Sequence, residues 1–328
     1  MSARGLKVTE QPPDEFRRDK MTDVLGVIGV GAMGAGIARR LAKTGAALWV
    51  HDIDKAAAEK FRPIAQGIAN SPKEIADRAT IVFISVPNLK AGEEVILGKE
   101  GLIHGKAVKI IVDLSTTGAR FAEKMFDATK KHGMTYIASP ISGGVTGAAE
   151  GTLAVMSSGP EDAYNRIRPY LNCFGKGIHY LGEQPGNAQT MKLINNMLST
   201  TGLVMACEAF VFGTKAGLDP DLMLDVINSG TGRNSATLGK LPKAILPRRF
   251  DYGAKTAITE KDNELILEEA DALGVDLSIV RAAQKIWHAI IAQGAADEDN
   301  TTLIKYLERT AGVVVQGKAA KERQEAES

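Results

Sequence analysis

The sequence predicts a doubly wound α/β domain followed by an all-helical domain. Short apolar runs alternate with helix-like segments as far as residue 181, and the first run leads into a glycine-rich turn. After Gly186, apolar residues recur only at helical spacing. Alternating strands and helices build a mainly parallel sheet, whereas successive amphipathic segments build a helical layer. The chain has 328 residues, a length that suits about two domains.

We expect four segments along the chain. Residues 1–22 are polar and carry both charge signs, which predicts a disordered arm; they lack the apolar core of a signal peptide and are too acidic for a transit peptide. Residues 23–185 should form the α/β domain and residues 186–310 the helical domain. Residues 311–328 should form a polar tail that is frayed from about Gly317.

The composition excludes several classes of function. The net charge of +1 gives no reason to expect a nucleic acid or an anionic membrane surface as partner, and no run approaches the roughly 20 apolar residues of a membrane span. With two cysteines, a disulfide framework is not expected, and the cytoplasm is the expected location. The five histidines show no metal-ligand spacing, so no metal is expected.

The first element is a continuous apolar run over residues 24–30, typical of a strand buried on both faces of a parallel sheet. A helix pattern follows and reaches Lys43, and a second apolar run covers residues 47–50. The turn between strand and helix has the spacing GxGxxG, the fingerprint of a Rossmann-type dinucleotide-binding domain. Its glycines allow a tight turn, approach of the backbone to a pyrophosphate, and close helix packing. The residues expected to contact the cofactor here are Gly29, Gly31, Ala32, Met33 and Gly34.

An acidic residue follows the second strand. Asp52 lies 21 residues after Gly31 (52 − 31), close to the spacing expected for a carboxylate on the adenosine ribose. Such a carboxylate would accept hydrogen bonds from the ribose hydroxyls and repel a 2′-phosphate. This favours NAD over NADP. In the alternative interpretation, Asp52 or Asp54 only caps the next helix.

Later strands predict where a ligand would lie. We expect strands at residues 81–86, 108–114, 135–137, 153–156 and 178–181, in a mainly parallel sheet. Ligands of such sheets bind beyond the carboxyl ends of the strands. The residues that follow strand ends, and should therefore meet in one crevice, are Val86, Pro87, Asn88, Ser115, Thr116, Ser142, Gly143 and Gly144.

The helical part is expected to contain helices at residues 188–216, 220–228, 257–274, 277–293 and 302–308. The first of these carries a lysine and an asparagine four residues apart, Lys192 and Asn196, which share one helix face. In a cleft they could hold a hydroxyl or carbonyl group and move a proton. The alternative is a solvated lysine on an amphipathic helix.

From residue 23 to about residue 310, the chain resembles the β-hydroxyacid dehydrogenase family, typified by 3-hydroxyisobutyrate dehydrogenase. The glycine-rich turn is similar to the family's GxGxMG motif, and a Lys-Asp pair and three further segments are similar to its other motifs. These are Asp113-Leu114-Ser115-Thr116, Pro140-Ile141-Ser142-Gly143-Gly144, residues 186–196, and Lys261-Asp262. The sequence departs from the family pattern at Ala119, Ala138, Ala188 and Asn263.

The resemblance implies a role for each matching residue. Lys192 would be the catalytic acid or base, and Asn196 would hold the reacting group. Ser142, Gly143 and Gly144 would bind the acid group of the substrate, with Lys261 reaching toward both substrate and nicotinamide. The residues implied to line the cofactor are Val86, Pro87, Asn88, Thr116, Lys261 and Asp262. For the Ser-Gly-Gly segment a plain turn remains open, and for Lys261-Asp262 an exposed helix pair.

By this resemblance, we expect NAD-dependent hydride transfer to or from a small 3-hydroxy acid, and a homodimer or homotetramer formed through the helical domain. One alternative is imine or enamine reduction with NADPH. Another is a cofactor-binding interaction module without turnover. The turn at residues 229–234 could bring Arg233 or Asn234 to the substrate, while Trp287 and His288 are expected to be partly core.

Overall fold

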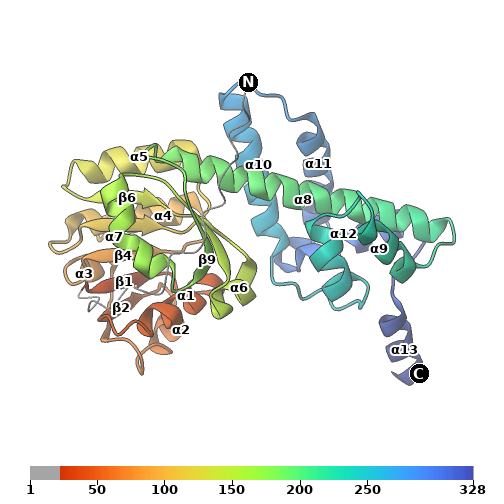
Figure 1. The fold of residues 1–328 in the computed structure, drawn as a ribbon, viewed down its shortest axis with the longest axis horizontal. Helices are drawn as coiled ribbons and strands as arrows, with labels where there is room; N and C mark the ends of the chain where they lie inside the picture. Colours follow the sequence, from red (N-terminus) through yellow and green to blue (C-terminus); the bar gives the residue numbers. More distant parts are fainter. Residues whose placement is uncertain (1–22, 328) are drawn as a thin grey trace, which may run out of the picture.

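The computed structural model describes residues 23–327, so the predicted disordered arm lies outside the described residues. The first domain is built on a six-stranded parallel sheet with the order β3-β2-β1-β4-β5-β6, shown in Figure 1. Its strands are β1 (Leu25–Ile28), β2 (Leu48–His51), β3 (Gly67–Ile68), β4 (Ile81–Ile84), β5 (Ile110–Asp113) and β6 (Thr135–Ala138). Reversal of the strand order at β1 and β4 confirms the doubly wound prediction and creates a crevice at that point.

Helices cover both faces of this sheet. Alternate residues of one strand enter different cores: Leu25 and Val27 pack in one cluster, and Ile28 packs in the other. Central strands buried in this way need apolar residues at every position, which is why they appear as continuous runs in the sequence. The covering helices are α1 (Ala32–Ala42), α2 (Lys55–Glu59), α3 (Pro72–Ala76), α4 (Leu89–Leu97), the short 3₁₀ helix η1 (Leu102–His104) and α5 (Ala119–Lys130).

The later strands do not extend the parallel sheet, so that part of the prediction is wrong. They form a separate three-stranded sheet in which β7 pairs antiparallel with β8 and β8 pairs parallel with β9. The chain continues from the end of β6 through Ser139 and Pro140 into β7 without reversing, since Ala138 pairs antiparallel with Ser158 and Ile141 with Val155 in the same register. The elements here are β7 (Ile141–Ser142), α6 (Gly144–Glu150), β8 (Leu153–Ser157), α7 (Glu161–Leu171) and β9 (Gly175–Tyr180).

The second domain is helical, as predicted, and is organised around a core that contains the fully buried Trp287 and Phe210. The sequence did not predict its π-helix, η2, which contains Pro242; a proline without an N–H interrupts the α-helical hydrogen-bond ladder. The elements are α8 (Gly186–Lys215), α9 (Pro220–Ser229), η2 (Ala236–Ile245), α10 (Thr256–Ala272), α11 (Ser278–Ala292), the 3₁₀ helices η3 (Ala295–Asp297) and η4 (Asn300–Thr302), and α12 (Leu303–Ala311).

Helix α8 joins the two domains. Its first turns pack on α5 and β8, and its later turns pack on α9, α11 and α12, so it runs from the sheet through the helical domain (Figure 1). By length and composition alone this helix could cross a membrane, with a mean hydropathy of 1.4 over its most apolar window, whereas the sequence predicted no such segment. Because 44% of that window is buried inside the protein, the same features suit a core helix.

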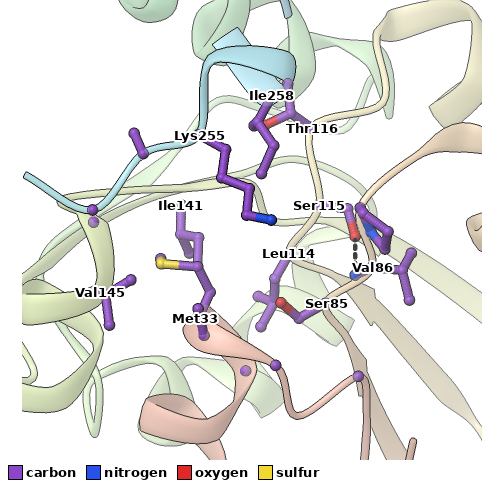
Figure 2. Close-up of a pocket in the computed structure, with 18 of the residues that line it drawn as sticks. Met33, Ser85, Val86, Leu114, Ser115, Thr116, Ile141, Val145, Lys255 and Ile258 are labelled. Carbon is purple, nitrogen blue, oxygen red and sulfur yellow. Dashed lines mark hydrogen bonds between the residues drawn. The ribbon is translucent and has the colours of Figure 1, made fainter. Parts of the chain in front are cut away.

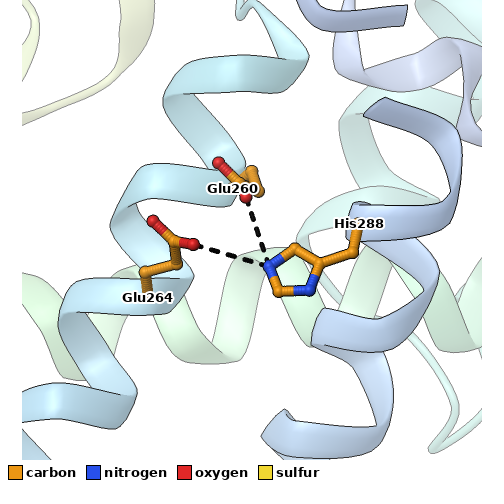
Figure 3. Close-up of side chains that lie close together, drawn as sticks. All are labelled: Glu260, Glu264 and His288. Atoms are coloured by element: carbon orange, nitrogen blue, oxygen red, sulfur yellow. Dashed lines mark ion pairs between the residues drawn. The ribbon is translucent and has the colours of Figure 1, made fainter. Parts of the chain in front are cut away.

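Helices α10 and α11 are also linked by polar side chains. Figure 3 shows His288 of α11 facing Glu260 and Glu264 of α10, with Nε2 3.2 Å and 3.5 Å from their carboxylate oxygens. Burial and the neighbouring Glu264 raise the pKa of Glu260. His and Glu are residue types that can bind metal ions, and these three lie close together. Spacing in the sequence did not predict this cluster, because its members come from two helices. Trp287 is core, whereas His288 is exposed.

The chain beyond α12 differs from the predicted frayed tail. It forms α13 (Lys318–Glu327), and the preceding segment docks on the helical domain. The backbone N–H of Lys318 donates to Asp221 Oδ2 at 2.6 Å, Gly317 N–H donates to Leu246 O at 2.9 Å, and Ala320 is buried. Buried apolar contacts and satisfied backbone groups hold the start of this helix, and the charged sequence alone did not indicate them.

Candidate active site

A cleft of about 2340 Å³ lies between the α/β domain and the helical domain. Its walls come from the ends of β1, β4 and β5, from the loop before α6, and from α8 and α10. In Figure 2, Met33 and Leu114 of the α/β domain face Lys255 and Ile258 at the start of α10. Pockets for single drug-sized ligands occupy roughly 300–1,000 Å³. This cleft therefore has room for a dinucleotide and a second small molecule.

The glycine-rich turn has two kinds of glycine. Gly29 has a φ of +85°, and a Cβ on it would lie 2.1 Å from Ser85 O. A Cβ on Gly34 would lie 1.9 Å from Gly29 O, so the backbone itself requires these two glycines. A Cβ on Gly31 would meet nothing within 4 Å. Gly31 is the N-cap of α1, whose first N–H groups face the cleft without a side-chain cap. This open cradle at a helix N-terminus fits the pyrophosphate of a dinucleotide.

The two aspartates after β2 have different roles. Asp54 is the N-cap of α2, accepting hydrogen bonds from the N–H groups of Ala56 and Ala57. Asp52 instead accepts from Val30 N–H at 2.7 Å and from Asp54 N–H at 2.8 Å, and it lines the cleft beside the cradle. The carboxylate predicted to contact the ribose is thus held by backbone N–H groups next to the turn.

The strand ends of β4 and β5 meet, as the sequence predicted. Val86 N–H donates to Ser115 Oγ at 3.1 Å, as drawn in Figure 2. Val86, Pro87 and Thr116 line the cleft. Asn88 is not among the described residues that line it; its side chain caps α4 by accepting from Ala91 N–H at 2.8 Å.

Lys192 lies on the cleft-facing side of α8 and is only 8% exposed. Its Nζ forms no hydrogen bond with any residue in the range 23–327. Burial lowers the pKa of Lys192 to about 8, the carboxylate of Asp262 opposes this shift, and the ammonium group of Lys261 adds to it. A lysine with such a pKa can take up and release a proton near neutral pH. The alternative of a solvated surface lysine is therefore wrong.

A series of polar contacts near Lys192 links the helical domain to the α/β domain. Asn196 Nδ2 donates to Asp262 Oδ2 at 2.7 Å, and Asp262 Oδ1 lies 2.8 Å from Lys261 Nζ. Lys261 Nζ also donates to Thr116 O at 3.0 Å. These contacts join α8, α10 and the end of β5, so they fix the side chains around Lys192 across the domain boundary. Asp262 is 7% exposed, and the Lys-Asp pair is not the exposed helix pair of the alternative interpretation.

The Ser-Gly-Gly segment lies opposite α8. Ser142 Oγ accepts from Asn195 Nδ2 at 3.2 Å. Gly143 and Gly144 have φ values of +133° and +69° and lead into α6, and a Cβ on Gly144 would meet nothing within 4 Å. The segment therefore presents backbone without side chains to the cleft, within reach of the helix that carries Lys192.

Two residues of α8 that sequence reasoning missed help to build the site. Asn195 bonds Ser142 and also donates to Asn196 Oδ1 at 3.3 Å. Gln189 is fully buried; its Nε2 donates to Ser115 O at 2.9 Å, and its Oε1 accepts from Thr117 N–H at 3.0 Å. Gln189 lies three residues before Lys192, so helical spacing could have indicated that they share a face.

The turn at residues 229–234 contributes less than predicted. Arg233 is not among the described residues that line the cleft. Asn234 lines it, but its Oδ1 accepts from the N–H groups of Ala236 and Thr237 at the start of η2. Asn263, one of the positions where the sequence departs from the family pattern, is buried and accepts a hydrogen bond from Thr200 Oγ1 at 2.7 Å.

Comparisons with known proteins cover both domains. Residues 24–182 match the family model described as the NAD binding domain of 6-phosphogluconate dehydrogenase. Residues 186–307 match the model described as NAD-binding of NADP-dependent 3-hydroxyisobutyrate dehydrogenase. The chain is 34% identical to 2-(hydroxymethyl)glutarate dehydrogenase of Eubacterium barkeri, over 89% of this chain and 97% of that protein.

Two further similarities cover nearly whole proteins. The chain is 31% identical to 2-hydroxy-3-oxopropionate reductase of Escherichia coli, over 87% of this chain and 97% of that protein. A crystal structure of 3-hydroxyisobutyrate dehydrogenase from Salmonella typhimurium superimposes with a TM-score of 0.78 at 26% identity, covering 87% of this chain and 99% of the other.

Proposed function

Because the chain belongs to the β-hydroxyacid dehydrogenase family, whose enzymes act on CH–OH donors with NAD(P), we propose that it transfers a hydride between NAD and a small 3-hydroxy acid, with Lys192 moving the hydroxyl proton. The observation that carries this proposal is a buried lysine, with a pKa of about 8, at the junction of a dinucleotide cradle and a segment of bare backbone. The relatives named for hydroxy acids and their semialdehydes favour this chemistry over imine reduction.

The proposed mechanism assigns one task to each group. When bound, the nicotinamide accepts or supplies the hydride. In oxidation, the neutral amine of Lys192 takes the hydroxyl proton, and in reduction the ammonium form returns it. Asn196, one turn along α8 and held by Asp262, orients the reacting oxygen. Lys261 links α10 to the end of β5 by donating to Thr116 O, beside the place assigned to the nicotinamide and the substrate.

The acid group of the substrate is assigned to Ser142, Gly143 and Gly144. Successive backbone N–H groups with positive φ values can form a concave anion site, and the missing side chains let a carboxylate approach closely. Asn195 of α8 donates a hydrogen bond to Ser142. The segment that binds the acid group of the substrate is therefore linked directly to the helix that binds its hydroxyl group.

A direct assay tests this function. The purified protein is incubated with NAD or NADP and 3-hydroxyisobutyrate, 3-hydroxypropionate, glycerate or serine, and nicotinamide absorbance is followed. We expect turnover with at least one 3-hydroxy acid and none with lactate, a 2-hydroxy acid of similar size. Cofactor binding without turnover of any 3-hydroxy acid would contradict the proposal.

The preference for NAD is assigned to Asp52. Removing its charge with Asp52→Asn, which keeps the shape of the side chain, should lower the ratio of NAD to NADP affinity by about 10- to 100-fold, the usual value of a charged hydrogen bond. Titration of protein fluorescence with each cofactor measures the ratio. The control is Asp54→Ala, which should cost about 1 kcal/mol of stability by removing the α2 cap while leaving the ratio unchanged. A wild-type preference for NADP would overturn the assignment.

The partner is proposed to be a second copy of this chain, seated on one face of α8. Met191, Ile194, Leu198, Met205 and Phe212 are large apolar side chains that remain 37–77% exposed. Their spacing of three, four and seven residues places them in one stripe along the helix. A continuous apolar stripe is typical of a protein interface, and dimers or tetramers could form by covering it.

Adding charge to this stripe tests the interface. The double variant Met205→Asp/Phe212→Asp should lower the molecular mass measured by light scattering to that of one chain, because two carboxylates per copy would have to be buried without partners. The control is Leu273→Asp, which changes an exposed apolar side chain away from α8 and should leave the mass unchanged. A wild-type protein with the mass of one chain at high concentration would contradict the proposal.

A further inference from the structure

A second lysine is buried in the wall of the cleft. Lys240 of η2 is 7% exposed and lines the same cleft as Lys192. Its Nζ lies 3.4 Å from Ser199 Oγ and 5.9 Å from the centre of the Tyr252 ring. Within residues 23–327, no carboxylate forms an ion pair with it. The proposed mechanism gives this lysine no task.

An unpaired buried ammonium group is costly, and proteins normally pair it with an anion. Burial lowers the pKa of Lys240, and the neighbouring Cys207 and Asp299 oppose this shift only in part. The Asp299 carboxylate is already engaged, because it accepts from the N–H groups of Gly253 and Thr301. Among residues 23–327, the hydrogen-bond partner of Lys240 Nζ is the hydroxyl of Ser199, and an anion arriving in the cleft could provide the missing negative charge.

Ser199, the neighbour of Lys240, indicates how far this second lysine lies from Lys192 along α8. Ser199 lies seven residues after Lys192 (199 − 192), two turns along the same face of α8, which separates them by about 10 Å along the helix axis. A five-bond arm from a hydroxyl oxygen to a distant carboxyl carbon spans roughly 6 Å when extended. A hydrogen bond at each end adds about 3 Å. With both hydrogen bonds the arm reaches about 12 Å, so it is long enough to span the roughly 10 Å that separates Lys192 from Ser199 along α8.

We propose that Lys240, assisted by Ser199, binds a second carboxylate of the substrate, so that the preferred substrates are 3-hydroxy acids bearing a carboxyethyl arm. This rests on the proposed function, because it takes the hydroxyl to be at Lys192 and the first carboxylate at Ser142, Gly143 and Gly144. The second carboxylate would supply the anionic partner that the buried lysine lacks among the described residues and would favour its protonated form, with Ser199 as an additional hydroxyl donor. The lysine and its hydroxyl neighbour Ser199 are therefore both in place in the cleft wall.

The experiment compares three probes with the wild-type enzyme and the isosteric variant Lys240→Met. The probes are 2-(hydroxymethyl)glutarate, its ester methylated on the distant carboxyl, and 3-hydroxyisobutyrate. For the wild type, kcat/KM with the diacid should exceed that with the ester by roughly 10- to 100-fold, the usual gain from a charge-assisted hydrogen bond. In Lys240→Met this ratio should fall to near one. Lys240→Arg keeps the charge and should retain part of the ratio.

Lys285→Met is the matched control, because it removes a positive charge from an exposed position on α11, outside the cleft. It should keep the wild-type ratio. Lys240→Met should unfold at the same or a higher temperature than the wild type, since it replaces a buried amine that has no carboxylate partner among residues 23–327 with an apolar side chain. Loss of the ratio in a stable protein would then report binding rather than misfolding.

A binding measurement separates this inference from the proposed function. Calorimetry with NAD present should show that glutarate binds at least tenfold more tightly than butyrate, and that Lys240→Met removes the difference. If 3-hydroxyisobutyrate is turned over while diacid and ester are equivalent, the inference fails and the function stands. If glutarate binding depends on Lys240 but no 3-hydroxy acid reacts, the function fails and the second anion site stands.

Discussion

Replacing Lys192 with methionine is expected to lower kcat by about 10²- to 10⁴-fold, the usual contribution of a positioned general acid or base. Methionine fills a similar volume in the buried wall of the cleft but cannot carry a proton. Cofactor affinity, measured by fluorescence titration, should change little, because the glycine turn and Asp52 lie in the other domain. The control is Lys215→Met, at the exposed end of the same helix. Full turnover by the Lys192 variant would refute the assignment.

The pH dependence of the wild-type enzyme should report the same group. Burial lowers the pKa of Lys192 to about 8, so below that pH most of the lysine is protonated and cannot accept a proton. The rate of oxidation should therefore rise with pH and level off above about 8. Reduction needs the protonated form, so its rate should fall over the same range. The two opposite profiles should share one apparent pKa. They are measured as kcat/KM for the hydroxy acid in oxidation and for its oxidised product in reduction.

Alanine at the second and third glycines of the turn should have contrasting effects. In Gly34→Ala, the new Cβ would lie 1.9 Å from Gly29 O, so the turn and α1 must move. We expect a loss of roughly 1–3 kcal/mol of stability, as for other overpacked sites, together with loss of cofactor binding. Chemical denaturation and cofactor titration measure the two effects.

In Gly31→Ala, the new Cβ would meet nothing within 4 Å. Its φ of −66° is accessible to alanine, but alanine is a poorer N-cap than glycine, so stability should fall by no more than about 1 kcal/mol. Cofactor affinity should nevertheless fall by at least about tenfold, because the methyl group occupies the space through which a pyrophosphate approaches the backbone. Unaltered cofactor affinity in this variant would show that the cradle does not hold the pyrophosphate.

The sequence could predict the cofactor turn well because its signals are local. Gly29, Gly31 and Gly34 lie within six residues of one another, between an apolar strand and a helix. Because these elements follow one another directly in the sequence, their arrangement does not depend on distant segments. Asp52 was placed by a spacing that one βαβ unit imposes. The helical domain was predicted from periodicity alone, but η2 was missed because a π-helix has no distinctive apolar period.

The side-chain network was less accessible to sequence reasoning. Asn196, Asp262 and Lys261 could be selected individually, but the 2.7 Å and 2.8 Å contacts that join them depend on how α10 docks on α8. Asn195 and Gln189 were overlooked, because an amide has no charge and suggests no chemistry until its partner is known. Their partners, Ser142 and Ser115, are more than 50 residues away in the chain.

The sequence by itself determined the order of an α/β domain and a helical domain, the cradle at Gly31, and the choice of Lys192, because apolar periodicity, glycine spacing and motif order are properties of neighbouring residues. Only the tertiary structure decided that Lys192 is buried, that its pKa falls to about 8, and that Lys240 lies buried in the same wall without a carboxylate partner among residues 23–327. Burial and pairing arise from segments brought together by packing. The electrostatic state of a side chain therefore depends on contacts that no local pattern specifies.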